Sequence, residues 1–134
     1  YITLDTLKYL KRGGRLTPAA ALIGSILRIK PVLQIQGEKL DAFRKVPTLK
    51  KAKETMIEAL RHDLATRFQD FAARGEMRIG VAHTKNEAEA NLFAEELRAA
   101  FPTVPINYID PLSLSVSCHI GPGSLACGLM RVIV

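Results

Sequence analysis

The chain has 134 residues and a net charge of +6, with 48% apolar and 24% charged residues. These values predict one soluble globular domain, residues 1–134, that is long enough to bury a hydrophobic core. They exclude a membrane-spanning helix, because the longest apolar stretch, residues 19–27, is interrupted by Gly24 and Ser25 and is far too short. We find no signal peptide, and because Tyr1 is not an initiator methionine we expect a fragment or a processed form.

Two helices are expected in the first part of the chain. The first covers residues 3–11 and stops at Gly13-Gly14. Thr17-Pro18 then supplies an N-cap residue and a proline suited to the first helical position of a second helix over residues 19–27. This second helix is apolar nearly all round, so we expect it to pack against a sheet or to line something apolar.

The middle of the chain predicts a hairpin followed by a long helix. Pro31 is expected to end the preceding helical unit, and residues 32–36 and 39–46 form two strands joined by a turn at Gly37-Glu38. Pro47-Thr48 begins a helix over residues 49–70. A single apolar stripe at helical spacing marks its core face: Leu49, Ala52, Met56, Leu60, Leu64 and Phe68.

Strands and helices continue to alternate after Gly75. We expect strands over residues 77–83, 106–109 and 114–120, and a helix from Asn86 to about Phe101 with Glu89 placed as in a capping box. The closing residues 128–134 also have the pattern of a strand. This alternation predicts an α/β fold with a single mixed sheet and helices packed on it.

The strand over residues 114–120 is expected to lead into a tight turn at Gly121-Pro122-Gly123. His119 lies two residues before this turn, and the two glycines permit a positive φ or a close backbone approach. An imidazole held there can donate a hydrogen bond to an anion, and turn amides can add more. The plainer interpretation is a β-hairpin whose histidine satisfies a backbone carbonyl.

The two cysteines, Cys118 and Cys127, are too few for a secreted disulfide framework. In a hairpin over residues 116–129 they would face each other. A disulfide is conceivable there, but we expect two reduced, buried thiols and a cytoplasmic protein.

Catalytic and metal chemistry find little support in the residues. There is no glycine-rich phosphate loop, and the histidines and cysteines lack metal-ligand spacing, so we expect no catalytic residue, metal or cofactor. Cys118 and His119, as neighbours on a strand, would point to opposite faces and could not pair as nucleophile and base. For His83, at the end of its strand, we expect a surface or capping role.

Positive charge is concentrated in the first part of the chain. Residues 1–53 contain 12 Lys or Arg against 3 Asp or Glu, whereas residues 54–134 contain 7 against 10. Such a patch indicates an anionic partner, although a solvated helix face accounts for any single lysine. Without interleaved aromatics or a recognition helix, nucleic acid remains a minor alternative. The excess comes from Lys8, Lys11, Arg12, Arg15, Arg44, Lys45, Lys50, Lys51 and Lys53.

Several segments together resemble one protein family. In chain order they are residues 7–16 with Lys-Arg-Gly-Gly-Arg, residues 20–31 ending in Ile-Lys-Pro, the hairpin, and residues 119–123 with His-Ile-Gly-Pro-Gly. They resemble the carboxyl-terminal half of the DegV family of bacterial fatty-acid-binding proteins, across nearly the whole chain. The resemblance implies the carboxyl-terminal lobe of a two-lobed α/β protein that holds one long-chain fatty acid between its lobes.

The resemblance also implies a role for individual residues. His119 would hydrogen-bond or orient the ligand carboxyl group, and Gly121 and Gly123 would shape the turn around it. Arg15 would supply positive charge near the head group or at the kinase-facing surface. Ile23, Ile26 and Ile29 would lie against the acyl chain. The protein would be a carrier without catalysis of its own, presenting the carboxyl group to a fatty acid kinase whose acyl phosphate feeds phospholipid synthesis.

Two features depart from the family pattern. The amino-terminal lobe, which carries carboxylate-binding Thr and Ser residues in the family, is not in this chain, so a homodimer of the fragment remains open. Lys45-Val46-Pro47 lacks the arginine that commonly follows Lys-Val, unless Arg44 replaces it. The alternative functions are an enzyme using His119 as general acid or base, and a basic nucleic-acid-binding domain.

Overall fold

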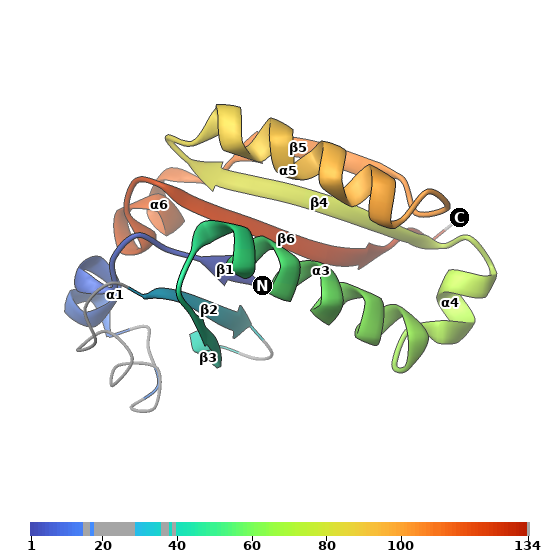
Figure 1. Ribbon diagram of the computed structural model, residues 1–134, viewed down its shortest axis with the longest axis horizontal. Helices are drawn as coiled ribbons and strands as arrows, with labels where there is room; N and C mark the ends of the chain where they lie inside the picture. The colour runs from blue at the N-terminus through green and yellow to red at the C-terminus, as the bar shows by residue number, and fades with distance from the viewer. Residues whose placement is uncertain (15–16, 18–28, 36–37, 39, 134) are drawn as a thin grey trace.

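The computed structural model describes residues 1–14, 17, 29–35, 38 and 40–133. Its centre is a six-stranded sheet in the order β3-β2-β1-β6-β4-β5 (Figure 1). Neighbouring strands are antiparallel except for the parallel pair β4–β5, so the predicted mixed sheet is confirmed. The strands are β1 (Ile2–Thr3), β2 (Lys30–Ile35), β3 (Leu40–Val46), β4 (Met77–Thr84), β5 (Ile106–Pro111) and β6 (Ser124–Arg131).

Two long helices cover one face of this sheet. Helices α3 and α5 lie across it side by side, whereas α1 and α6 lie together at one end of the molecule (Figure 1). Within the described ranges, no helix is long and apolar enough to cross a membrane. The helices are α1 (Lys8–Gly13), α3 (Leu49–Ala65), α4 (Gln69–Ala73), α5 (Glu87–Ala100) and α6 (Leu114–Ile120).

Alternation along the central strands divides the side chains between two cores. The first core lies between the sheet and the pair α3 and α5, and includes Leu125 and Cys127 of β6. The second core lies on the other face, where Ile2 and Leu33 meet Leu10 of α1 and Ile120 of α6. Because successive side chains on a strand point to opposite faces, Ala126 and Gly128 of β6 lie on the second face.

The predicted helix over residues 49–70 is interrupted. Its start is confirmed, because Thr48 is the N-cap and its Oγ1 accepts a hydrogen bond from the Lys51 backbone N–H at 3.2 Å. The helix ends at Ala65 because Thr66 leaves helical geometry, and α4 begins only at Gln69. The Thr66 hydroxyl donates to the His62 carbonyl at 2.7 Å, a local bond of the kind that competes with helix continuation.

The largest error concerns residues 114–120, which form helix α6 and not a strand. Short apolar runs fit either structure, and here the helix places Val116 and Ile120 four residues apart on one face. Ile120 is buried in the second core, and the Ser117 hydroxyl donates to the Leu112 carbonyl at 3.1 Å across the first turn. The expected hairpin over residues 116–129 is therefore wrong.

Two further expectations near the start of the chain are corrected. Residues 3–11 are not one helix: β1 ends at Thr3 and α1 begins only at Lys8, although Gly14 in left-handed geometry does terminate α1. Pro31 lies inside β2 instead of ending a helix. Proline has no backbone N–H to donate to a neighbouring strand. Pro31 is tolerated in β2 because β1 pairs only with Val32 and Leu33 and so does not extend alongside Pro31. The predicted helix over residues 19–27 and the turn at Gly37 lie outside the described residues.

Candidate ligand site on the open face of the sheet

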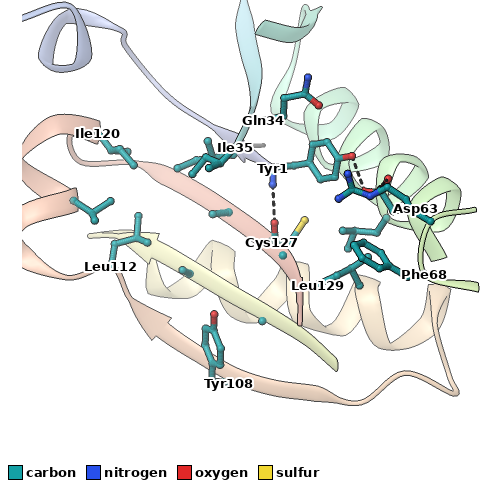
Figure 2. Close-up of a pocket in the computed structure, with 18 residues that line it drawn as sticks. Tyr1, Gln34, Ile35, Asp63, Phe68, Tyr108, Leu112, Ile120, Cys127 and Leu129 are labelled. Atoms are coloured by element: carbon teal, nitrogen blue, oxygen red, sulfur yellow. Dashed lines mark hydrogen bonds and ion pairs between the residues drawn. The ribbon is translucent and has the colours of Figure 1, made fainter. Parts of the chain in front are cut away.

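A hollow of about 330 Å³ opens on the second face of the sheet and extends past the edge of β1 to residues of the first core, among them Leu60 and Leu129. Its floor consists of small residues from the two central strands β4 and β6: Gly80, Ala82, Ala126 and Gly128. Figure 2 shows Ile120 and Leu112 at one end of the hollow and Phe68 at the other. The volume lies at the lower end of the range for small-molecule sites, which are concave and mostly apolar.

The small floor residues form two neighbouring rows across the sheet. Ala82 pairs with Ala126, and Gly80 pairs with Gly128, with Tyr108 of β5 on the other side of Gly80. The Tyr108 ring rests directly on Gly80: a Cβ placed there would lie 2.6 Å from the Tyr108 hydroxyl oxygen. Gly80 therefore permits the ring to lie flat against the strand, and larger residues would displace it.

Apolar side chains around the hollow are unusually exposed. The exposed fraction is 61% for Ile35, 41% for Tyr108 and 39% for Val116, and all three line the hollow. An exposed apolar surface of this kind, next to a concavity, typically marks a place where another molecule or domain binds.

A second hollow of about 290 Å³ adjoins the first and brings in His119. The two share Ile35, Val116 and Ile120, so they form one continuous groove. His119 is half-buried in the last turn of α6, and its imidazole lies against Gly13 at the end of α1. A Cβ on Gly13 would lie 3.0 Å from the His119 Cε1, so glycine is required for this approach.

Gly121 and Gly123 both have positive φ values, 83° and 85°. The Tyr9 ring packs on Gly121, where an added Cβ would lie 2.5 Å from Cδ2, and the Asp5 carboxylate packs on Gly123. These glycines therefore shape the turn after α6 through backbone geometry and close packing.

A hydrogen-bond network connects this turn to the start of α5. Asn86 donates its side-chain N–H to the Gly123 carbonyl at 3.2 Å, and the Gly123 N–H donates to the Thr84 carbonyl at 2.8 Å. His83 Nδ1 accepts the Asn86 backbone N–H at 3.1 Å, which fits the predicted capping role. The alternative of a surface role is wrong, because His83 is buried. The capping box is wrong, because Glu89 accepts from the buried Lys53 ammonium at 3.0 Å instead.

From its floor the groove continues past Tyr1 and ends near the carboxyl end of α3. The Tyr1 hydroxyl donates to the Asp63 carboxylate at 2.7 Å, and Arg67 lies 3.5 Å from the same carboxylate (Figure 2). Burial, together with the Asp63 carboxylate, raises the pKa of Tyr1 to about 12. The Tyr1 phenol is therefore neutral at physiological pH and acts as a hydrogen-bond donor.

The two cysteines lie on different elements and do not form a disulfide. Cys118 is exposed on α6, whereas Cys127 is buried on β6, and both are free thiols. Burial raises the pKa of the Cys127 thiol to about 11, so this thiol remains protonated and unreactive at neutral pH. Both cysteines are free as expected, but the prediction that both are buried is wrong for Cys118. The predicted face-to-face arrangement is also wrong, because Cys118 lies on helix α6.

Not all the predicted site residues fall within the groove. His119 lines it, whereas Gly121 and Gly123 lie in the adjoining turn. Ile29 is partly buried against the second core and lines neither hollow. Arg15, Ile23 and Ile26 lie outside the described residues.

Sequence analysis missed the groove floor. Its only signal is the spacing of small residues two apart, Gly80 with Ala82 and Ala126 with Gly128. In strands this spacing puts them on one face. Across the part of the chain that the structure describes, no group of three His, Cys, Asp or Glu residues could hold a metal ion.

The fold and the groove define an α/β lobe with a core on each face of its sheet and an apolar groove left open on the second face. The model of the DegV family of uncharacterised proteins matches residues 1–132, so the chain belongs to the DegV family. It is 37% identical to protein DegV of Bacillus subtilis over 126 residues, covering 93% of this chain but 42% of that protein. A DegV domain-containing protein of Clostridium acetobutylicum is 36% identical over 121 residues, covering 90% of this chain and 39% of the relative.

Solved structures agree with this assignment. A fatty acid binding DegV family protein from Streptococcus agalactiae has a TM-score of 0.80 and 29% identity, covering 98% of this chain and 44% of that one. DegV of B. subtilis, described as a fatty acid binding protein, has a TM-score of 0.75 and 35% identity with the same coverage. The chain thus spans about two fifths of these relatives' length and corresponds to one lobe of their fold.

Proposed function

We propose that this lobe holds the hydrocarbon chain of a long-chain fatty acid against the open face of its sheet, with the carboxyl group near His119. The observation that carries the proposal is the continuous apolar groove, which has a half-buried imidazole at one end and a floor of Gly and Ala residues. Further support comes from the S. agalactiae and B. subtilis proteins, which are described as fatty acid binding.

The energetics suit such a ligand. Each buried methylene contributes about 0.8 kcal/mol, so a long acyl chain is held tightly with very few polar contacts. The groove is open on one side, and the exposed Ile35 and Val116 at its rim need a covering surface. In this proposal the rest of a DegV-family protein supplies that surface, and the fatty acid lies between the two lobes.

Individual residues have proposed roles at the carboxyl end. His119 donates a hydrogen bond to the ligand carboxylate, and Arg15 adds positive charge. Gly121 and Gly123 act indirectly by fixing the turn after α6. Ile23 and Ile26 contact the acyl chain, whereas Ile29, which lines neither hollow, supports the groove indirectly from the second core.

We further propose that the protein is a carrier and that a separate fatty acid kinase acts on the bound ligand. The kinase forms an acyl phosphate for phospholipid synthesis, and the carrier works in the cytoplasm without a cofactor.

A basic surface, which we define as Arg44, Lys45 and Lys50, suits docking of that kinase. All three are exposed, on edge strand β3 and at the start of α3. The Arg44 guanidinium stacks 4.6 Å from the centre of the Phe43 ring, which holds it in one place. In this proposal Arg44 takes the part of the arginine that is missing after Lys45-Val46.

The decisive experiment uses the full-length parent protein purified from bacteria. Its organic-solvent extract is examined by mass spectrometry for fatty acids in near-stoichiometric amount. A C14–C18 fatty acid at about one per protein supports the carrier function and identifies the ligand. An empty extract, together with no uptake of added fatty acid, would refute it.

A further inference from the structure

We propose that Gly128, with Tyr108 as the facing wall, determines how long an acyl chain this lobe accepts. This inference rests on the proposed fatty acid binding and names the specificity determinant within the groove. It starts from the row Tyr108–Gly80–Gly128, which crosses three neighbouring strands on the open face.

The two glycines of this row differ in what occupies the space above them. Above Gly80 the space is filled, since the Tyr108 ring atom Cε1 lies 2.8 Å from the position of an added Cβ. Above Gly128, a Cβ would meet no atom within 4 Å among the described residues. The free cross-section of the groove in this row is therefore the space over Gly128, bounded on one side by Tyr108.

The position of the row along the groove makes it a limit on length. The carboxyl end lies under α6, whose Ser117 hydroxyl is 3.2 Å from that of Thr84 on β4. Gly80 lies four residues from Thr84 on the same strand, which corresponds to about 13 Å at the rise of a β-strand. An acyl chain whose carboxyl end lies under α6 at the level of Thr84, and which follows β4 and β6, reaches the Gly80–Gly128 row only with its more distal carbons.

The backbone at Gly128 accepts other residues. Gly128 lies in the interior of β6. Its backbone φ is not positive, unlike that of Gly121 and Gly123, so it is in a range that other residues adopt. A side chain there costs no backbone strain and projects into the groove. Gly128 substitutions thus change the groove without disturbing the two cores.

The test uses the full-length parent loaded from an equimolar mixture of C12 to C18 fatty acids, with bound lipids measured by mass spectrometry. We expect Gly128→Leu to shorten the mean bound chain by about two to four carbons, because leucine adds four carbons to a close-packed space. Gly128→Ala should give a smaller shift in the same direction. Tyr108→Ala should shift the profile toward longer chains.

Ala99→Leu on the exposed side of α5 is the matched control and should leave the profile unchanged. Thermal unfolding checks that each variant is folded; if Gly128→Leu is not, the Gly128→Ala and Tyr108→Ala profiles decide. Unchanged profiles in folded variants of a loaded parent overturn this inference alone. A parent that binds no fatty acid overturns the proposed function and this inference with it.

Discussion

At the residue scale, the site depends on close approaches that only glycine allows. The His119 imidazole rests on Gly13, the Tyr9 ring on Gly121 and the Tyr108 ring on Gly80. In each case the ring of another residue occupies the space that a side chain on the glycine would fill. Two of these glycines belong to the sequence motifs that suggested the family, so the motifs owe part of their composition to ring packing and part to turn geometry.

His119→Ala in the full-length parent should weaken fatty acid retention by about tenfold to a hundredfold, because a hydrogen bond to a charged group contributes about 1.5–3 kcal/mol. Retention is measured by titration with a fluorescent fatty acid. His62→Ala removes an exposed histidine from the last turn of α3 and serves as the control. Equal affinities of the His119 and His62 variants would rule out a head-group role for His119.

At the scale of elements, local signals predicted some segments well and failed for others. Thr48 begins α3 as expected, because its side chain bonds the Lys51 N–H within four residues. Residues 114–120 have no comparably decisive local signal, since alternation and helical spacing both fit their apolar residues. They form α6 because Ile120 is buried against residues far away in the sequence, among them Leu10 and Leu33.

Thr48→Ala should lower the free energy of unfolding by about 1 kcal/mol, as loss of an N-cap side chain typically does. The measurement is urea denaturation followed by circular dichroism. Thr103→Ala, an exposed threonine after α5, should change stability by less than about 0.5 kcal/mol. If both substitutions have the same effect, the Thr48 cap does not stabilise α3.

At the scale of the whole molecule, charge and apolar exposure separate onto different surfaces. The open face carries Ile35, Tyr108 and Val116, whereas the basic surface occupies edge strand β3 and the start of α3. Charged side chains on an edge strand also discourage pairing with other sheets. Ligand binding and partner docking can therefore be tested independently.

The double variant Arg44→Glu with Lys45→Glu in the loaded parent should lower the rate of acyl phosphate formation by a fatty acid kinase about tenfold at low salt, because reversed charges slow association. Bound lipid should stay the same. Arg98→Glu makes the same type of charge change on α5 and should have little effect. A normal rate for the double variant would exclude this surface from kinase docking.

The sequence by itself determined the α/β class, the hairpin of β2 and β3, the starts of α3 and α5, and the family. Each of these depends on short-range patterns such as caps, alternation and contiguous motifs. Only the tertiary structure decided that residues 114–120 are helical, that Pro31 lies in a strand, and that Gly80, Ala82, Ala126 and Gly128 form one floor. The reason is physical: strand order and register bring these residues together, and both depend on contacts between distant segments.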